Sequence, residues 1–472
     1  MTDLSHRTLV AGVDSSTQST KVIVCDAQTG EVLREGRAPH PDATEVDPQE
    51  WWSAFETATR DDLLEGVQAI SVAGQQHGMV TLDESGQVVR PALLWNDTRS
   101  APDAGQLVAE LGGAAVWADA VGTVPLASIT VSKLRWLAEH EPERAARVHD
   151  VVLPHDWLTG QLVGGGALAG VELVTDRGDA SGTGYWSPGE HAYRMDLLEL
   201  AFGRELGVPR VLAPHEPAGT TPGGILVGPG TGDNMAAALG LGLGPGDVGV
   251  SLGTSGTVFG VADTATHDPA GLVAGFADAT GRFLPLVCTL NAARVLTAAA
   301  KMLGTDLAGL EWLALEAEPG AGGLTFLPYL DGERTPDLPA ATGTLSGLTR
   351  ATMTPANVAR AAIEGMLCGL ADGLDALRDN GVPVRRVVLI GGATRSTAVQ
   401  HVAAGAFGVP LLLPEPGEYV ALGAARQAAW VLSGESEPPV WPERESRLPE
   451  HDTSWAAQVR ARYAGLRRTL YP

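Results

Sequence analysis

The sequence predicts an α/β protein made of two related halves, and two observations support this prediction. Residues 10–22 (VAGVDSSTQSTKV) and 247–258 (DVGVSLGTSGTV) share one pattern, in which short β-branched runs flank a loop of Ser, Thr and Gly. Strand-like and helix-like runs alternate after each copy. The copies stand half a chain apart, which favours duplication of a domain over a chance likeness between two small-residue loops.

The expected elements follow in chain order. Each repeat predicts a strand, a tight polar turn and a second strand. Short apolar runs predict further strands at 68–75, 150–156, 386–392 and 410–415. Helix-like runs predict helices at 48–64, 234–242, 291–303, 355–381, 396–408 and 420–434. The last four carry apolar residues at helical spacing, several opened by Ser, Thr or Pro and closed by Gly.

The chain has 472 residues, enough for two or three domains that each bury a core. We expect one domain over 1–243 and a second over 244–434. Residues 435–452 (ESEPPVWPERESRLPEHD) are rich in proline and acidic residues, which predicts an exposed connection before a short final helix. Residues 435–472 therefore form the third part.

Composition narrows the classes of partner. Apolar residues make up 44% of the chain and charged residues 19%, as in ordinary globular proteins. The formal charge of −24 disfavours nucleic acid and anionic membranes as partners. Cys25, Cys288 and Cys368 share no metal-ligand spacing, which fits a reducing compartment without disulfides. With no signal-peptide-like or membrane-spanning run, we expect a cytoplasmic protein.

The two repeated loops are the first candidate for chemistry. A turn of Gly, Ser and Thr gathers backbone N–H groups and hydroxyls around a concavity that suits phosphate oxygens. Two such loops could clamp a nucleoside triphosphate. Only the first carries Asp14 and Lys21, and a carboxylate beside phosphate is useful when a cation lies between them, so Asp14 suggests Mg²⁺ held through water. The alternative is an ordinary hairpin with a satisfied aspartate.

The segment 228–242 (GPGTGDNMAAALGLG) places Asp233 and Asn234 at the start of a helix. Asp233 is either a helix cap or a catalytic base, and capping is the commoner use. The helix dipole is expected to lower its pKa, which phosphoryl transfer tolerates because that reaction depends mainly on positioning of the attacking hydroxyl. The glycine pair of 386–396 (RVVLIGGATRS) could admit a flat ligand or a phosphate.

Two further segments, 73–78 (AGQQHG) and 91–100 (PALLWNDTRS), gather hydrogen-bonding groups with one aromatic face, as a polyhydroxylated sugar requires. The residues are Gln75, Gln76, His77, Trp95, Asn96, Asp97 and Arg99. A zinc site is not expected, because no second His or Cys stands at ligand spacing. The turns 328–336, where Asp331, Glu333 and Arg334 are expected to neutralise one another, and 176–186 are assigned structural roles.

Together these motifs resemble the FGGY carbohydrate kinases over nearly the whole chain. The resemblance rests on GVDSSTQSTKV, AGQQHG, RPALLWNDTRS, LPHDWLTGQL, GDASGTGYW, GTGDN, VSLGTSGTV, FLPYLDGERTP, LIGGATRS and ALGAARQAAW, in this order. It implies two ribonuclease-H-like α/β domains of the actin-like ATPase superfamily flanking a catalytic cleft. The N-terminal domain would bind sugar and carry the catalytic aspartate, and the C-terminal domain would bind nucleotide.

The resemblance also implies roles for single residues. Asp233 matches the catalytic base and is also a metal-binding candidate. Asp14 matches an aspartate that works with Mg²⁺ through water. The implied sugar-binding residues are Gln76, His77, Asn234, Trp95 and Asp97. The implied ATP-binding residues are Thr17, Lys21, Gly253, Thr254 and Ser255 around the phosphates, and Gly391, Gly392 and Arg395 around adenosine.

At two positions the chain departs from the commoner family pattern. Gln76 stands where many relatives have Met, and His155 stands where they often have Lys. The expected activity is ATP- and Mg²⁺-dependent phosphorylation of D-xylulose to D-xylulose 5-phosphate, with a homodimer as a possible assembly. The rivals are the same chemistry on ribulose, erythritol, glycerol or gluconate, an actin-like nucleotide switch, and an inactive sugar sensor. Gluconate is disfavoured because Arg99 alone could meet its carboxylate.

Overall fold

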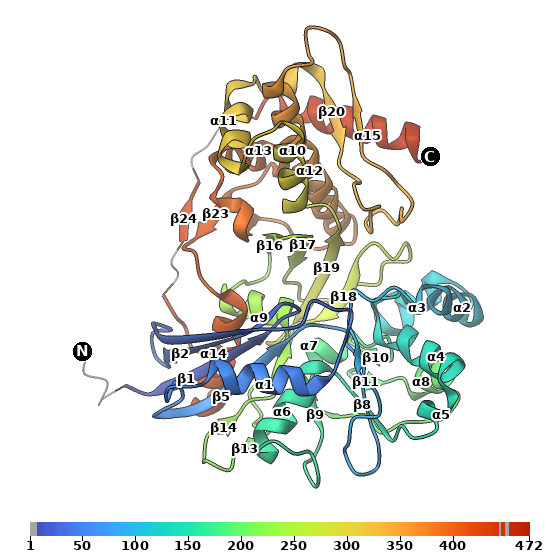
Figure 1. Cartoon of the computed structure of the whole chain (residues 1–472), viewed down its shortest axis with the longest axis vertical. Helices are drawn as coiled ribbons and strands as arrows, with labels where there is room; N and C mark the ends of the chain where they lie inside the picture. The colour runs from blue at the N-terminus through green and yellow to red at the C-terminus, as the bar shows by residue number, and fades with distance from the viewer. Residues whose placement is uncertain (1–6, 443–444, 449–452) are drawn as a thin grey trace. The chain divides into compact units, whose positions relative to one another are not determined.

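The computed structural model describes residues 7–442, 445–448 and 453–472 (Figure 1). The chain divides into two compact units. The first runs over 1–243, 263–284 and 417–443, and the second over 244–262, 285–416 and 444–472. The expected boundary after residue 243 is thus a boundary between units, but 263–284 and 417–434 group with the first unit, not with the second half of the chain as expected.

The first unit is built on a mixed sheet ordered β13-β14-β5-β1-β2-β3, with β15 also paired to β5. β2 is antiparallel to both β1 and β3, whereas β5 is parallel to β1 and β14 is parallel to β5. The bounds are β1 Leu9–Ser15, β2 Ser19–Asp26, β3 Val32–Pro39, β5 Val67–Gly74, β13 Gly219–Thr220, β14 Leu226–Val227 and β15 Thr231–Gly232.

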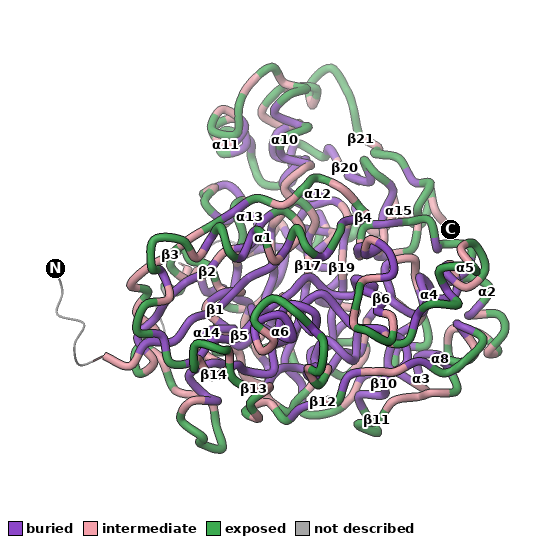
Figure 2. The backbone as a smooth tube through the Cα atoms, turned by 60° about the horizontal axis from the view of Figure 1, so that its bottom comes forward, coloured by how far each residue is buried: buried purple, intermediate pink, exposed green. Residues whose placement is uncertain are grey.

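Alternate residues of β1 pack against helices on opposite faces of this sheet. Val13 lies in one core with Trp51 of α1 (Pro48–Ala58) and Trp157 of α6 (Pro154–Gly164). Val10 lies in another core with the alanines of α14 (Tyr419–Ser433). α14 therefore joins the first unit because its small-residue face covers β1 and β5. β1 is buried along its whole length, whereas β3 is largely exposed (Figure 2).

The second unit repeats the same strand order, which confirms the duplication inferred from the sequence. Its sheet runs β19-β17-β16-β22-β23-β24, with β17 antiparallel to β16 and β19, and β22 parallel to β16 and β23. β16 and β17 thus correspond to β1 and β2. The bounds are β16 Asp247–Leu252, β17 Gly256–Gly260, β19 Phe283–Thr289, β22 Arg386–Ile390, β23 Leu411–Pro414 and β24 Glu445–Arg447.

Helices and short strands complete each unit. In the first unit they are β4 Glu45–Val46, β6 Val80–Leu82, β7 Ala92–Leu93, α2 Ala101–Leu111, α3 Ala114–Val121, α4 Thr130–His140, α5 Pro142–Ala145, β8 Asp150–Val152, β9 Val174–Asp176, α7 Arg177–Ala180, β10 Trp186–Ser187, β11 Ala192–Tyr193, α8 Met195–Phe202, β12 Arg210–Leu212, α9 Asp233–Gly240 and β18 Ala274–Ala277. In the second they are α10 Ala293–Met302, α11 Leu307–Glu316, β20 Thr325–Leu327, β21 Thr344–Ser346, α12 Pro355–Asp379, α13 Thr397–Phe407 and α15 Ala456–Leu470, with 3₁₀ turns at Ala321–Gly323 and Gly392–Arg395.

Three expected elements differ. The strand expected over 150–156 ends at Val152, because Pro154 opens α6 and the Asp156 carboxylate accepts the Leu153 N–H. The helix expected over 48–64 ends at Ala58, before two aspartates with φ of 57° at 61 and 62. Part of the expected exposed connection is strand β24, paired to β23, while 443–444 and 449–452 lie outside the described residues.

No helix among residues 7–442, 445–448 and 453–472 is long and apolar enough to cross a membrane. The three cysteines are all free thiols, and those of Cys25 and Cys368 are buried.

Helices α9 and α14 pack so closely that glycine is required between them. A Cβ atom added at Gly423 would lie 1.8 Å from the Ala236 carbonyl oxygen. We therefore expect Gly423→Ala to lower the unfolding free energy of the first unit by about 1–3 kcal/mol, because backbone must shift to admit the methyl group. Thermal unfolding measures the change.

The matched control is Gly105→Ala in α2, where an added Cβ would meet nothing within 4 Å. This variant should be neutral or up to about 1 kcal/mol more stable, since alanine is the better helix former. Equal melting temperatures for the two variants would show that the α9–α14 contact is not tight.

Candidate active site

The expected catalytic residues of the first unit meet at one edge of its sheet. Asp14 is the penultimate residue of β1, Gln75 follows β5, and Asp233 follows β15. β1 and β15 both run parallel to β5, with Ser15 and Gly232 each aligned with Gly74. Because parallel strands end at the same edge, these side chains emerge together, as in other open α/β sheets that bind ligands there.

Asp233 is the first residue of α9, and Gly232 is the N-cap, so the capping role considered from the sequence does not apply. Its Oδ1 accepts hydrogen bonds from the backbone N–H and the Nδ2 of Asn234, both at 2.8 Å. Among the described residues, no donor reaches Oδ2. One carboxylate oxygen is thus held while the other is available to a ligand.

The pKa of Asp233 is raised to about 7, which corrects the expectation of a lowered pKa. Burial raises it most, followed by the negative charges of Asp14 and Asp179, while the hydrogen bonds from Asn234 lower it. The helix dipole is therefore outweighed, because it acts on a carboxylate that has little water and two like charges nearby. A carboxylate with this pKa is a competent general base near neutral pH.

Asp14 is 2% exposed, and its carboxylate accepts a hydrogen bond from Ser16. Lys21, its partner in the β1–β2 register, lies 3.5 Å away and also pairs with Glu418 at 2.5 Å. Burial raises the pKa of Asp14, and the Lys21 charge opposes the rise. The carboxylates of Asp14 and Asp233, of which the first raises the pKa of the second, are the oxygen donors that a hard divalent cation prefers.

The structure separates the residues expected to bind sugar into two groups. Gln76 Oε1 accepts a hydrogen bond from Asn234 Nδ2 at 2.9 Å, which places both amides beside Asp233. His77, with a φ of 66°, directs Nδ1 to the Gly182 carbonyl at 2.8 Å and lies against Phe276. Gln76, Asn234 and His77 thus form one buried or half-buried group.

In the second segment of the expected sugar cluster, 91–100, most of the polar side chains already bond to other protein groups. Both carboxylate oxygens of Asp97 accept hydrogen bonds, from Arg99 on both and from Thr44 on one, and Arg99 also pairs with Glu45. Burial raises the pKa of Asp97, but these donors lower it overall. Trp95 Nε1 donates to Thr17 Oγ1 at 2.8 Å, which ties the indole to the first loop. Asn96 is exposed.

In the second unit the expected nucleotide residues also share a sheet edge. Gly253, Thr254 and Ser255 form the turn between β16 and β17, and the Gly391–Arg395 turn follows β22, which is parallel to β16. Gly391 has a φ of 99°, and a Cβ there would lie 2.6 Å from the Leu252 carbonyl oxygen. Arg395, Gly391 and Gly392 are exposed.

Sequence reasoning missed a cation on the second loop. Arg294, in the first turn of α10, donates to the Thr254 carbonyl at 3.2 Å and pairs with Asp331 at 2.7 Å. Asp331 therefore does not neutralise Glu333 and Arg334 as expected. Glu333 instead accepts backbone N–H groups of Leu290 and Arg334. No spacing signal marked Arg294, because its partners lie about forty residues away on both sides.

A second missed feature is a buried cluster behind Gln76. His155 Nδ1 donates to Asp179 Oδ2 at 2.6 Å, and Nε2 lies 3.1 Å from Asp156 Oδ1 and 4.0 Å from Asp176 Oδ1. All four residues are at most 2% exposed. Burial alone would lower the pKa of His155, but the three carboxylates raise it to about 9. His155 is therefore an imidazolium at neutral pH.

This charge makes folding depend on pH. The folded pKa of His155 is about 9 against 6.5 for the free side chain, so its stabilisation is complete below pH 6.5 and is lost as pH rises through 9. The difference corresponds to about 3 kcal/mol at most. We expect the melting temperature to fall more between pH 6.5 and 9 in the wild type than in His155→Gln. Parallel curves for the two proteins would contradict this.

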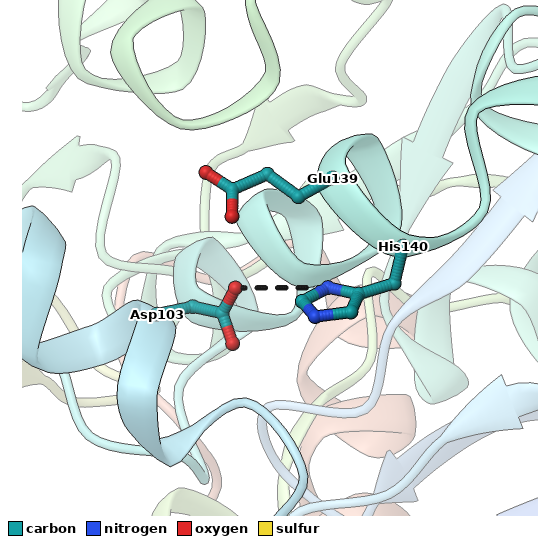
Figure 3. A group of neighbouring side chains, drawn as sticks. All are labelled: Asp103, Glu139 and His140. Atoms are coloured by element: carbon teal, nitrogen blue, oxygen red, sulfur yellow. Dashed lines mark ion pairs between the residues drawn. The ribbon is translucent and has the colours of Figure 1, made fainter.

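The described residues include one group of side chains with metal-ligand spacing, Asp103 on α2 with Glu139 and His140 at the end of α4 (Figure 3). Their ligand atoms lie within 4.8 Å of one another, and His140 Nδ1 is 4.0 Å from Asp103 Oδ1. Glu139 already pairs with Arg135, and Glu139 and His140 are exposed. We assign no metal to this group.

Comparisons with known proteins identify the family of the chain. The chain matches the N-terminal domain of the FGGY family of carbohydrate kinases over 9–240 and the C-terminal domain over 248–432. It is 48% identical over 442 residues to a xylulose kinase of Streptomyces coelicolor, covering 90% of this chain and 89% of the relative. It is 33% identical over 481 residues to a xylulose kinase of Escherichia coli, covering 95% and 96%.

Solved structures give the same result. A xylulose kinase from Bifidobacterium adolescentis has a TM-score of 0.90 at 45% identity, covering 98% of this chain and 99% of that one. A glycerol kinase from Plasmodium falciparum with ADP has a TM-score of 0.85 at 17% identity, covering 99% of both chains, and shows the shared fold alone. The chain belongs to the FGGY family of carbohydrate kinases, and it is an ATP-using kinase whose substrate is a small sugar.

Proposed function

We propose that this chain transfers the γ-phosphoryl group of ATP to O5 of D-xylulose, giving D-xylulose 5-phosphate. The observation that carries the proposal is the carboxylate of Asp233, whose Oδ1 is held by Asn234 while Oδ2 is available beside Gln76. The xylulose kinases with 48% and 45% identity support this choice of sugar.

The proton of the sugar hydroxyl would pass to Asp233 Oδ2 as the oxygen attacks phosphorus. Asn234 orients the carboxylate through Oδ1, so the accepting oxygen is fixed before the sugar arrives. Gln76 and His77 would bind the sugar hydroxyls that lie next to the reacting one. Since Oδ2 must be unprotonated to accept a proton, the reaction would require the ionised form of Asp233.

The donor set of Asp14 and Asp233 fits Mg²⁺, with Asp14 acting through water and Lys21 balancing its charge. When bound, the ion would neutralise charge on the phosphate oxygens. Thr17, Gly253, Thr254 and Ser255 would supply hydroxyls and backbone N–H groups to the phosphates. Gly391, Gly392 and Arg395 would contact adenosine, and Arg294 supports the second loop through the Thr254 carbonyl.

The product identifies the acceptor atom. The chain is incubated with MgATP and D-xylulose, and a proton–phosphorus correlation spectrum is recorded on the product. We expect one phosphate ester coupled to the two C5 protons. Coupling to the C1 protons, or a faster reaction with D-ribulose under the same conditions, would contradict the proposal.

A further inference from the structure

A continuous path of polar side chains joins the buried His155 to Asp233. His155 Nδ1 donates to Asp179 Oδ2 at 2.6 Å. Burial raises the pKa of Asp179, and both His155 and the nearby Gln76 amide oppose that rise. Gln76 Oε1 accepts from Asn234 Nδ2, and the same Nδ2 donates to Asp233 Oδ1. The path therefore ends on the oxygen of Asp233 that is held away from the substrate.

Among the carboxylates around His155, Asp179 alone reaches this path. Asp156 accepts the Leu153 N–H at the start of α6. Asp176 accepts the backbone N–H groups of Gly178 and Asp179 and the Thr231 hydroxyl. Asp156 and Asp176 are thus fixed by backbone and hydroxyl donors, while Asp179 connects the imidazolium to the Gln76 amide. Burial raises the pKa of both Tyr185 and Tyr193, and these carboxylates raise it further. Asp179 also contributes to the raised pKa of Asp233.

The orientation of the Gln76 amide has an electrostatic cause. Gln76 Nε2 and Asp179 Oδ1 are both buried, and within the described residues neither makes a hydrogen bond, although the amide is close enough to act on the Asp179 carboxylate. A carboxylate next to an amide attracts its N–H end and repels its oxygen. The negative charge of Asp179 therefore directs Nε2 inward, which leaves Oε1 to face Asn234. If the amide were reversed, two NH₂ groups would oppose each other and Asn234 would lose its acceptor.

We propose that His155 and Asp179 are positioning residues: they fix the Gln76 amide, which orients Asn234 and through it the proton-accepting oxygen of Asp233. This inference rests on the proposed role of Asp233 as base, and neither His155 nor Asp179 touches the sugar. Gln76 and His155, the two positions where the sequence departs from the commoner family pattern, thus lie on either side of Asp179 in one buried polar cluster.

The kinetic test uses the full chain with the best acceptor sugar and four variants: His155→Gln, His155→Lys, Asp179→Asn and Gln76→Met. His155→Gln, Asp179→Asn and Gln76→Met should each lower kcat by about 10–100-fold, because they free the orientation of a reacting group. The KM for ATP should stay within about twofold. His155→Lys keeps the positive charge beside Asp179 and should recover most of the loss.

A double variant shows whether Asp179 and Gln76 act through one path or affect the rate independently. Asp179→Asn combined with Gln76→Met should be no slower than the slower single variant, because either change alone breaks the path. Losses that multiply would overturn the proposal. So would an equal loss of kcat in Asp103→Asn, a matched control in which a buried carboxylate near a histidine is changed outside the path.

A spectroscopic readout separates failure of this inference from failure of the proposed function. In protein labelled with ¹⁵N-histidine, the His155 Nδ1 proton should give a far-downfield resonance, because it is held in a short bond to a carboxylate. The resonance should disappear in Asp179→Asn, shift in Gln76→Met and stay unchanged in Asp103→Asn. If the His155 resonance did not respond to Gln76→Met, the proposed coupling between His155 and Gln76 would be contradicted, whichever sugar the kinase accepts.

Discussion

Asp233→Ala lowers kcat for sugar phosphorylation by about 10²–10⁴-fold, the range found when a general base is removed. The effect is large because alanine offers no oxygen to accept the proton of the sugar hydroxyl. Asn234 also loses the Oδ1 atom to which it donates. ATP binding should persist, since two of the loops proposed for nucleotide, at 253–255 and 391–395, lie in the second unit and are not altered. The measurement is a steady-state assay with separate KM values for sugar and ATP.

Asp233→Asn provides a stricter version of the same test, because it keeps the shape and removes the charge. Asp103→Asn is the control for changing a buried carboxylate, and its kcat should stay within about twofold of the wild type. Turnover of Asp233→Asn near the wild-type level would exclude Asp233 as the base.

Asp14→Asn lowers kcat by about 10²-fold or more and raises the Mg²⁺ concentration needed for half-maximal rate, because half of the proposed oxygen donor set loses its charge. The asparagine still accepts a hydrogen bond from Ser16, so local structure should be retained. Lys21 would then face Glu418 alone. The rate is measured as a function of free Mg²⁺ at saturating sugar and nucleotide.

Asp26→Asn is the matched control at the far end of the same hairpin. The Asp26 carboxylate accepts the backbone N–H groups of Gln28 and Thr29 in a turn, and 8% of the residue is exposed. Its Mg²⁺ dependence should equal that of the wild type. If Asp14→Asn and Asp26→Asn shared one Mg²⁺ profile, Asp14 would have no part in metal binding.

Local patterns predicted most of the fold. The two repeats, alternating β-branched runs around small-residue turns, gave strands β1, β2, β16 and β17 and, through their likeness, the duplicated strand order. The grouping of 417–434 with the first unit could not be read locally. It depends on glycines that let α14 approach β1 and α9, at Gly12, Gly240 and Gly423, and close approach between distant segments leaves no periodic signal.

Within the candidate site, residue types were easier to predict than their partners. Gln76 and Asn234 were expected near the sugar, and they do lie together beside Asp233. Asp97 has the same chemistry but is bound to Arg99 and Thr44. The pKa of Asp233 was expected to fall because the sequence shows its helix position, while the burial and the charges of Asp14 and Asp179 that raise it come only from the fold.

The central claim is tested most directly by ADP release in a coupled assay with MgATP, across D-xylulose, D-ribulose, L-ribulose, D-fructose, gluconate, glycerol and no sugar. We expect strong stimulation by D-xylulose and only background turnover without sugar. A different winning acceptor would contradict the assignment of Gln76 and His77 to D-xylulose, while leaving the kinase chemistry in place. Turnover that does not depend on any sugar would contradict the account of Asp233 as the base for a sugar hydroxyl.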